Sequence, residues 1–104
     1  MSEFTVIMEP IATSDLRGIL RYIQETLKEP AIAKRVYLSI RDKINNLDQM
    51  PESFPLVRDD TLAQRGIRWI LAENYLVFFV VDSSMKRVNI IRVLHSRRDW
   101  QNLL

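Results

Sequence analysis

The spacing of apolar residues changes from a helical to a strand pattern close to residue 66, and this change limits the folds open to the chain. Before it, two sets of apolar residues recur at helical spacing: Leu16, Ile19, Leu20, Ile23 and Leu27, then Ile32, Val36, Ile40, Ile44 and Leu47. Each set forms one stripe of an amphipathic helix. The break between them, Glu29-Pro30, is short, and proline suits the first position of a helix. The first half therefore predicts an antiparallel helical hairpin.

Apolar residues in the last third follow strand patterns instead. Residues 67–71 begin a strand, Tyr75–Val81 is a continuous β-branched and aromatic run, and Arg87–Leu94 follows after a turn. Three successive strands with short turns predict an antiparallel meander. Residues 4–8 predict a first strand, stopped by Pro10. We expect a two-layer α+β domain in which the hairpin covers one face of the sheet.

Local signals predict where these elements begin and end. Thr13–Asp15 offers N-caps for the first helix, and residues 51–65 read as a loop with a short extended piece near Leu56-Val57. Gly18 lies inside the first helix, where glycine costs about 1 kcal/mol relative to alanine. We interpret Gly18 as a position of close helix packing.

The last strand and the C-terminus complete the predicted domain. Simple alternation places Val88, Ile90, Arg92 and Leu94 on one face of the strand and Ile91, Val93 and His95 on the other. Ser96 is predicted to cap a short terminal helix, and Asp99 to complete a capping box. We expect that helix to contact the core through Trp100, Leu103 and Leu104.

Length and composition narrow the class of protein. A chain of 104 residues suits a single domain over 1–104. With no cysteine and one histidine, disulfides, thiolate zinc sites and iron–sulfur clusters are excluded, and we expect no metal or cofactor. No apolar run approaches the ~20 residues that cross a bilayer. The N-terminus lacks the basic region of a signal peptide, so we expect a cytoplasmic protein.

Basic residues gather near the end of the chain. Eleven of the fifteen basic residues are arginines, and the segment from Lys86 to Arg98 has five bases and no acid. Arginine stays charged when partly buried and binds phosphate or carboxylate bidentately. The segment predicts a polyanionic partner, either nucleic acid or an acidic protein segment, with Lys86, Arg87, Arg97 and Arg98 as binding residues. A solvated basic edge without a partner is the alternative.

Candidate chemistry rests on arginine and histidine. Arg68, Arg92 and His95 are predicted at one end of the sheet, beside Arg97 and Arg98. Arginine can hold a phosphate and histidine can transfer a proton near neutral pH, so the set suits phosphodiester chemistry. Structural roles are the alternative: Arg92 would pair with an internal acid such as Asp99, and His95 would satisfy backbone groups. Trp69, Phe78 and Phe79 are read as core residues.

Three stretches together resemble a known family. The segment Asp15–Ile23 is similar to the D-L-x-x-I-x-x-Y-I pattern of ParE-type toxins, and Arg68 followed by Tyr75–Phe79 is similar to "R…Y-x-V-F-Y". The segment Val88–Asp99 resembles the closing "V-x-I-x-R-V-L-H-x-R-x-D", the most specific of the three. The chain thus resembles the RelE/ParE superfamily of toxins from bacterial type II toxin–antitoxin modules. The resemblance implies a helical hairpin against a twisted antiparallel sheet.

The superfamily divides by target, and the resemblance implies two alternatives. ParE-type members poison DNA gyrase, whereas RelE-type members are ribosome-dependent, metal-independent endonucleases that cut mRNA. The long hairpin, the D-L-R-G-I-L-R-Y run and the absence of lysine between Met50 and Met85 favour the ParE type, although His95 does not discriminate. Under the nuclease alternative, Arg68 and Arg92 hold the phosphate and His95 is the general acid.

The resemblance also implies partners. A toxin of this kind forms a complex with its cognate antitoxin, serves plasmid stabilisation and growth inhibition, and meets gyrase or, alternatively, ribosome and mRNA. A plain nucleic-acid-binding module using the basic segment is a third reading, but no DNA-reading motif is visible.

Overall fold

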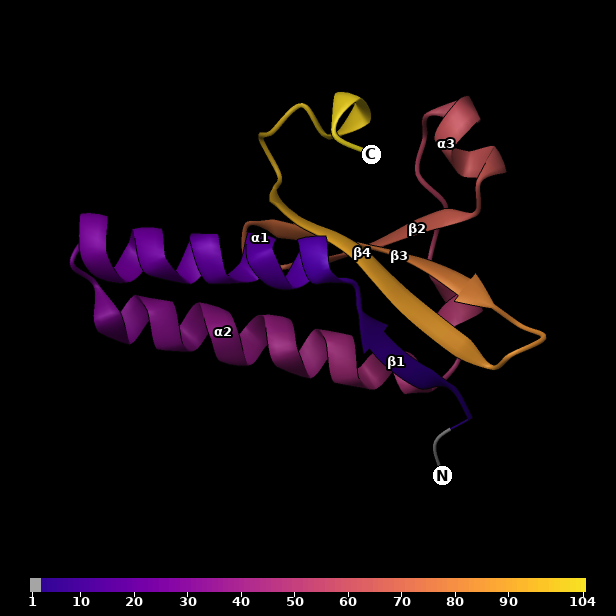
Figure 1. The fold of residues 1–104 in the computed structure, drawn as a ribbon, viewed down its shortest axis with the longest axis horizontal. Coiled ribbons are helices and arrows are strands. Elements are labelled where there is room, and N and C mark those ends of the chain that lie inside the picture. The colour runs from indigo at the N-terminus through magenta and orange to yellow at the C-terminus, as the bar shows by residue number, and fades with distance from the viewer. Residues whose placement is uncertain (1–2) are drawn as a thin grey trace.

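The structure, a computed structural model, describes residues 3–104 as four strands and three α-helices with short helical turns (Figure 1). In chain order these are β1 (Thr5–Met8), α1 (Pro10–Arg21), α2 (Pro30–Asn45), α3 (Asp60–Gln64), β2 (Ile67–Ala72), β3 (Tyr75–Asp82) and β4 (Arg87–His95). The predicted α+β class and the order of the main elements are confirmed. In the described range no helix is both long and apolar enough to span a membrane.

One mixed sheet carries the fold. Its strand order is β1-β4-β3-β2, with β1 parallel to β4 and the other pairs antiparallel. The predicted meander of the last three strands is therefore present. The chain leaves β1 through the helical hairpin and returns to the far edge as β2. This route places α1 against β4.

The helical hairpin begins earlier than predicted. Pro10 occupies the first position of α1, and Glu9 precedes it without a side-chain capping bond. The proposed caps at Thr13–Asp15 are wrong because proline, with its fixed φ, already suits the first helical turn. At the other end α1 continues as a π-helical turn, Tyr22–Thr26, and Lys28 reverses the chain with a φ of 56°. Figure 1 shows α1 and α2 lying side by side and extending past the sheet.

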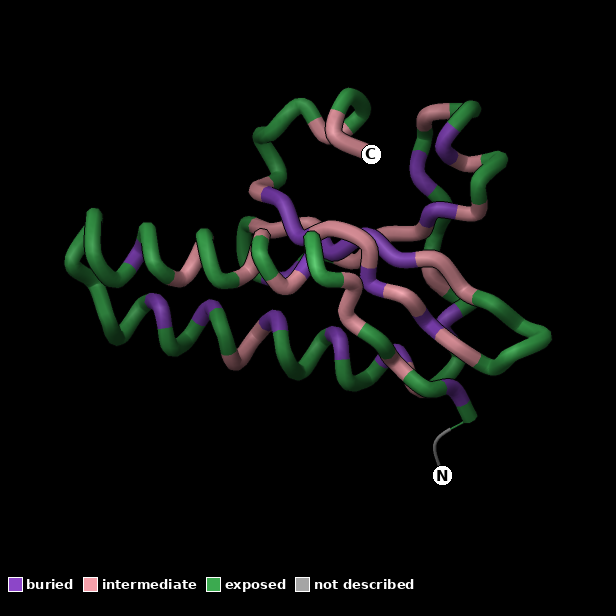
Figure 2. The backbone as a smooth tube through the Cα atoms, in the orientation of Figure 1, coloured by how far each residue is buried: buried purple, intermediate pink, exposed green. Residues whose placement is uncertain are grey.

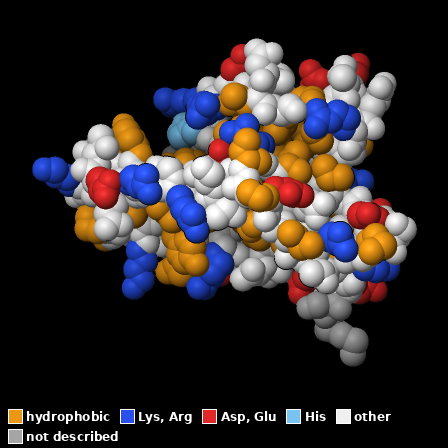
Figure 3. Space-filling view, viewed as in Figure 1, with side chains coloured by type: hydrophobic (Ala, Val, Ile, Leu, Met, Phe, Trp, Pro, Cys, Tyr) orange, Lys and Arg blue, Asp and Glu red, His pale blue; other side chains and the backbone are white. Residues whose placement is uncertain are grey.

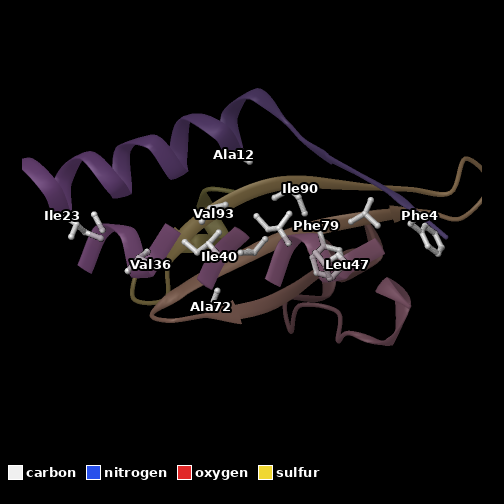
Figure 4. Close-up of a cluster of buried hydrophobic side chains, with 14 residues drawn as sticks. Phe4, Ala12, Ile23, Val36, Ile40, Leu47, Ala72, Phe79, Ile90 and Val93 are labelled. Atoms are coloured by element: carbon white, nitrogen blue, oxygen red, sulfur yellow. The ribbon is translucent and has the colours of Figure 1, made fainter. Parts of the chain in front are cut away.

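Two apolar clusters lie on opposite faces of the sheet. The larger fills the space between the hairpin and the sheet, and Figure 4 shows Ile40 of α2 and Leu47, in the turn after that helix, on the side of Phe79 and Ile90. The second lies under the segment after α2 and the C-terminus, and contains Val57, Leu62, Ile67, Phe78 and Leu94. Figure 2 shows buried positions recurring along α2 and concentrated in the central strands. The core reading of Phe78 and Phe79 is thus confirmed.

A β-bulge changes the faces of β4. Phe78 lies opposite Arg92, whereas Phe79 lies opposite Ile90, so Ile91 is an extra residue. Val93 consequently joins Ile90 in the larger cluster, and Leu94 belongs to the second cluster. The prediction that Leu94 shares a face with Ile90 is wrong, because one inserted residue reverses the alternation beyond it.

The segment before β2 is more structured than a loop. Asp59 caps the short helix α3 by accepting a hydrogen bond from the Leu62 N–H at 3.0 Å. Leu56 forms an isolated bridge with Arg68, which confirms the extended piece near Leu56-Val57.

The C-terminus is a single 3₁₀ turn, Trp100–Asn102, instead of a capped helix. The predicted capping box is wrong: Asp99 precedes the turn but makes no capping bond, and its carboxylate accepts from the Asn102 side chain at 2.6 Å. The backbone N–H of Ser96 donates to the Asn74 carbonyl at 2.8 Å. Apolar contact does hold the turn, since Trp100 lies with its ring centroid 5.5 Å from that of Phe78.

Candidate functional site

Arg92 is held on several sides by structural partners. Its Nε and Nη2 atoms lie 2.8 Å and 2.9 Å from the two carboxylate oxygens of Asp15, and Nη1 donates to the Leu103 carbonyl at 3.0 Å. Only 16% of the Arg92 side chain and 13% of the Asp15 side chain are exposed. The hydrogen bond with Asp15 raises the pKa of Arg92, although burial alone would lower it. The expected internal acid therefore exists, but it is Asp15 and not Asp99.

Arg68 has a different neighbourhood. Its Nη1 atom donates to the Phe54 carbonyl, at the start of the segment that runs along β2. Arg68 lies opposite Phe79 on β3, whereas His95 lies opposite Tyr75, four residues away. At the usual rise of a strand this separation is about 13 Å along β3. The structure therefore does not bring Arg68, Arg92 and His95 together around one point.

A groove lies instead between α1 and the edge of the sheet where β3 begins and β4 ends. Its volume is about 570 Å³, and its lining includes Ser14, Asp15, Gly18, Ile19, Tyr22, Tyr75, Val93, Leu94, His95 and Arg98. Figure 3 shows the histidine at the surface beside basic side chains. Of the predicted site residues, His95 and Arg98 meet here.

His95 is oriented by two contacts. Its ring lies edge-on to Tyr75, with centroids 5.4 Å apart and planes at 83°. Its Nδ1 atom accepts a hydrogen bond from the backbone N–H of Arg97 at 3.1 Å. The backbone role expected for His95 is therefore present, and the neutral ring carries its proton on Nε2. Burial, followed by the nearby Tyr22, raises the pKa of Tyr75 above its usual 10.0, so Tyr75 stays a neutral phenol at physiological pH.

The two tyrosines were not foreseen as site residues. A partial signal exists for Tyr22, because it follows Gly18 by four residues and so lies on the same side of the helix. Tyr75 could be found only from the pairing of β3 with β4, which places it opposite His95. The prediction of close helix packing at Gly18 is wrong, because a Cβ at this position would meet no atom within 4 Å.

The basic segment does not form one surface patch. Lys86 and Arg87 precede and begin β4, whereas Arg97 and Arg98 follow its end, about 26 Å away at the usual rise of a strand. Lys86 lies 4.9 Å from the centre of the Phe4 ring, and Arg87 is opposite Asp82. Arg97 and Arg98 are exposed next to the groove, and no acidic side chain of residues 3–104 forms a salt bridge with them.

Comparisons with known proteins agree with this fold. No curated protein sequence matches the chain. A solved structure described as the chromosomal ParDE toxin–antitoxin system from P. aeruginosa is similar with a TM-score of 0.72 and 19% identity, covering 89% of this chain and 96% of that one.

A second solved structure, the toxin–antitoxin complex RelBE2 from Mycobacterium tuberculosis, has a TM-score of 0.63 and 19% identity, covering 89% and 98% of the two chains. Sequence supplies the stronger link, because residues 6–100 match the family described as the ParE toxin of the type II toxin–antitoxin system parDE. From this match over nearly the whole chain, the protein belongs to the ParE toxin family within the RelE/ParE superfamily.

Proposed function

We propose that this type II toxin stops bacterial growth by poisoning DNA gyrase, and that a cognate antitoxin holds it inactive. The choice of gyrase as the target rests on the hydrogen bonds that Arg92 makes within the chain. Its guanidinium is engaged by Asp15 and by the Leu103 carbonyl. A guanidinium used in this way is not free to hold a scissile phosphate.

RNA cleavage by the predicted residues would need them to converge. A positively charged group must lie beside the phosphate while the acid reaches the leaving oxygen. Arg68 instead binds the Phe54 carbonyl and lies far along the sheet from His95. Poisoning by binding makes no such demand, since it requires a complementary surface and no proton transfer. This difference favours gyrase as the target.

A second candidate function is favoured by the groove itself. In ribosome-dependent cleavage of mRNA, the 2′-hydroxyl gives its proton to water as its oxygen bonds to the adjacent phosphorus, the bond to the 5′-oxygen breaks, and an acid protonates that oxygen. His95 could donate the proton and Arg98 could stabilise the phosphate, with Tyr75 fixing the histidine ring. We rank this candidate second, because Arg92 and Arg68, the basic residues predicted to hold the phosphate, are turned to structural partners.

The proposed antitoxin follows from family membership and from the surface. The two similar solved structures are described as a toxin–antitoxin system and a toxin–antitoxin complex. The described surface also exposes apolar side chains along the hairpin, including Tyr22, Leu27 and Tyr37. Exposed apolar side chains near unpaired arginines suit a protein partner with apolar anchors and carboxylates.

Expression in a bacterium tests the proposal. The chain alone should stop growth, and co-expression of the antitoxin from the adjacent gene should restore it. In arrested cells DNA synthesis should fail while mRNA remains intact. The double variant His95→Gln, Tyr75→Phe should still arrest growth, because gyrase poisoning needs no acid. Loss of toxicity in a folded double variant, together with cut mRNA in cells expressing the wild type, would support the nuclease instead.

A further inference from the structure

We propose that a second pocket, on the face of the sheet away from the hairpin, binds a small aromatic carboxylate. The volume of this pocket is about 230 Å³, and its lining consists of Val57, Arg58, Trp69, Leu76, Phe78 and Trp100. None of these residues lines the groove beside α1, so the pocket is a separate feature of the surface. The inference does not depend on the target of the toxin, and its failure would leave the proposed function standing.

The floor of the pocket comes from the sheet. Trp69 of β2 lies directly opposite Phe78 of β3, and directly opposed residues of an antiparallel pair share one face. Leu76 precedes Phe78 by two positions on β3 and so shares that face as well. Phe78 is fully buried, whereas Trp69 and Leu76 are half-buried. The sheet therefore offers a ligand an aromatic and an aliphatic surface side by side.

Two segments that are far apart in the sequence form the walls. Val57 and Arg58 come from the segment before α3, and Trp100 comes from the C-terminal turn. Trp100 packs on Phe78, with the ring centroids 5.5 Å apart and the planes at 37°. Figure 1 shows the C-terminal turn and α3 on the same side of the sheet, away from α2. A planar ring between these walls would contact apolar groups of both walls and of the floor.

Arg58 supplies the charge that selects an anion. It is exposed, and in the described part of the chain no carboxylate forms a salt bridge with it. The adjacent acids, Asp59 and Asp60, do not line the pocket, and Asp59 accepts the hydrogen bond that caps α3. A guanidinium binds a carboxylate through two parallel hydrogen bonds. A ring that carries a carboxylate therefore matches both the apolar lining and Arg58.

The size and polarity of the pocket favour such an acid over a nucleotide. Sites for drug-sized ligands measure about 300–1,000 Å³, so a pocket of about 230 Å³ suits a single small ring system. A nucleobase carries donors and acceptors around its ring, and burying them without partners costs free energy. Among the described residues of the lining, the side chains other than Arg58 offer only the indole N–H groups of Trp69 and Trp100 for such bonds.

The C-terminal turn connects the pocket to the rest of the fold. Arg92 donates a hydrogen bond to the Leu103 carbonyl at 3.0 Å. Arg65 donates to the Leu104 carbonyl at 2.9 Å. A ligand in contact with Trp100 adds to the contacts that hold this turn. Because the pocket needs the folded turn, we expect the ligand to bind the folded chain alone and so to stabilise it.

NMR on the purified full chain tests the proposal. Both tryptophans of the chain line the pocket, so their indole N–H signals report directly on its occupancy. Phenylacetate is the probe, and dissociation constants are measured from the shifts of these signals. Two analogues separate the contributions: phenylethanol keeps the aromatic ring without the charge, and cyclohexylacetate keeps the charge without the aromatic ring.

Two variants are each paired with a matched control. Leu76→Trp fills the pocket, and Leu71→Trp makes the same change at the residue opposite Leu76, which is 49% exposed and does not line the pocket. Arg58→Gln removes the charge of the lining, and Arg41→Gln removes an exposed charge on α2.

We expect phenylacetate to shift both indole signals to saturation and to bind about fivefold more tightly than either analogue. Leu76→Trp should weaken its binding by about tenfold or more, and Arg58→Gln by about fivefold without affecting phenylethanol. Both control variants should bind as the wild type does. Saturating phenylacetate should raise the denaturation midpoint of the wild type and of Leu71→Trp, but not that of Leu76→Trp.

Several results would overturn the proposal. Shifts that do not saturate, or equal affinity for all three compounds, would show that no such site exists. Unchanged binding in folded Leu76→Trp would place the site elsewhere. Adenosine monophosphate that binds more tightly than phenylacetate would assign the pocket to a nucleotide. An antitoxin that loses affinity for Leu76→Trp but not for Leu71→Trp would assign it to the protein partner.

Discussion

Asp15 links three distant parts of the chain through one carboxylate. From α1 it receives two bonds from Arg92 and one from the Val93 N–H at 3.0 Å, and Arg92 extends the contact to the Leu103 carbonyl. The partners lie 77 and 78 positions away in sequence, so local pattern could identify Asp15 only as a cap. The pair fixes α1 against β4 and thereby sets one wall of the groove.

Loss of the Asp15 charge should destabilise the fold. Asp15→Asn leaves the largely buried Arg92 without its counter-ion and should lower the free energy of unfolding by about 3 kcal/mol. Asp42→Asn removes the acid of an exposed pair, Arg41–Asp42, and should change it by less than about 0.5 kcal/mol. Urea denaturation compares the two. Equal effects would show that the buried pair contributes no more than a surface pair.

Tyr75 gives the structure a dependence on alkaline pH. Its folded pKa is raised by burial and by Tyr22, whereas in the unfolded chain it returns to about 10. The stabilising contribution is therefore full below pH 10 and is lost as pH rises through the folded pKa, since the unfolded chain ionises first. Tyr75→Phe should flatten this decline in stability, measured by denaturation between neutral and strongly alkaline pH. A decline equal to that of the wild type would assign it to other groups.

At the scale of elements, the pattern of apolar residues predicts the chain well, because the two long helices bury one side and β3, which is buried on both faces, is a continuous apolar run. The helical stripes and the three-strand meander follow directly from it. The hydrophobic pattern cannot reveal a β-bulge. The extra residue, Ile91, shifts the register by one and moves Val93 and Leu94 to the faces opposite to those predicted. The short helix α3 was missed because five residues give too few turns for a stripe, although its cap at Asp59 was a usable signal.

Lys28, after the first helical segment, and Gly66, before β2, both have a positive φ. Lys28 ends the first helical segment with a φ of 56°, a conformation that glycine adopts more easily than lysine. Lys28→Gly should therefore raise the free energy of unfolding by about 1 kcal/mol. Gly66, with a φ of 78° just before β2, should show the reverse, so Gly66→Ala should lower it by about 1 kcal/mol. Thermal unfolding of both variants checks the pair, and a change of the same sign in both would contradict this explanation.

At the scale of the whole molecule, the sequence shows which residue types are available for a polar site but not which of them lie together. His95 and Arg98 were foreseen and do share the groove. Arg68 and Arg92 were placed with them because strand order alone suggested a common sheet end. Their side chains are instead directed by partners that only the folded chain supplies, the Phe54 carbonyl and Asp15.

The basic residues between Lys86 and Arg98 are close in sequence but separated on the surface. Lys86 and Arg87 lie at one end of β4, and Arg97 and Arg98 lie beyond the other. Arg98 lines the groove beside α1, whereas Lys86 and Arg87 do not. The basic segment is therefore divided between the two ends of β4, and only the pair after the strand adjoins the groove.

The central claim is tested most directly by adding the purified chain to DNA gyrase in a supercoiling reaction. We predict that supercoiling stops and that cleaved DNA accumulates with the enzyme, both for the wild type and for the double variant His95→Gln, Tyr75→Phe. In a parallel cell-free translation reaction, synthesis should continue with its mRNA intact. Undisturbed supercoiling together with cut mRNA, abolished by the double variant, would contradict the account and assign the protein to RNA cleavage.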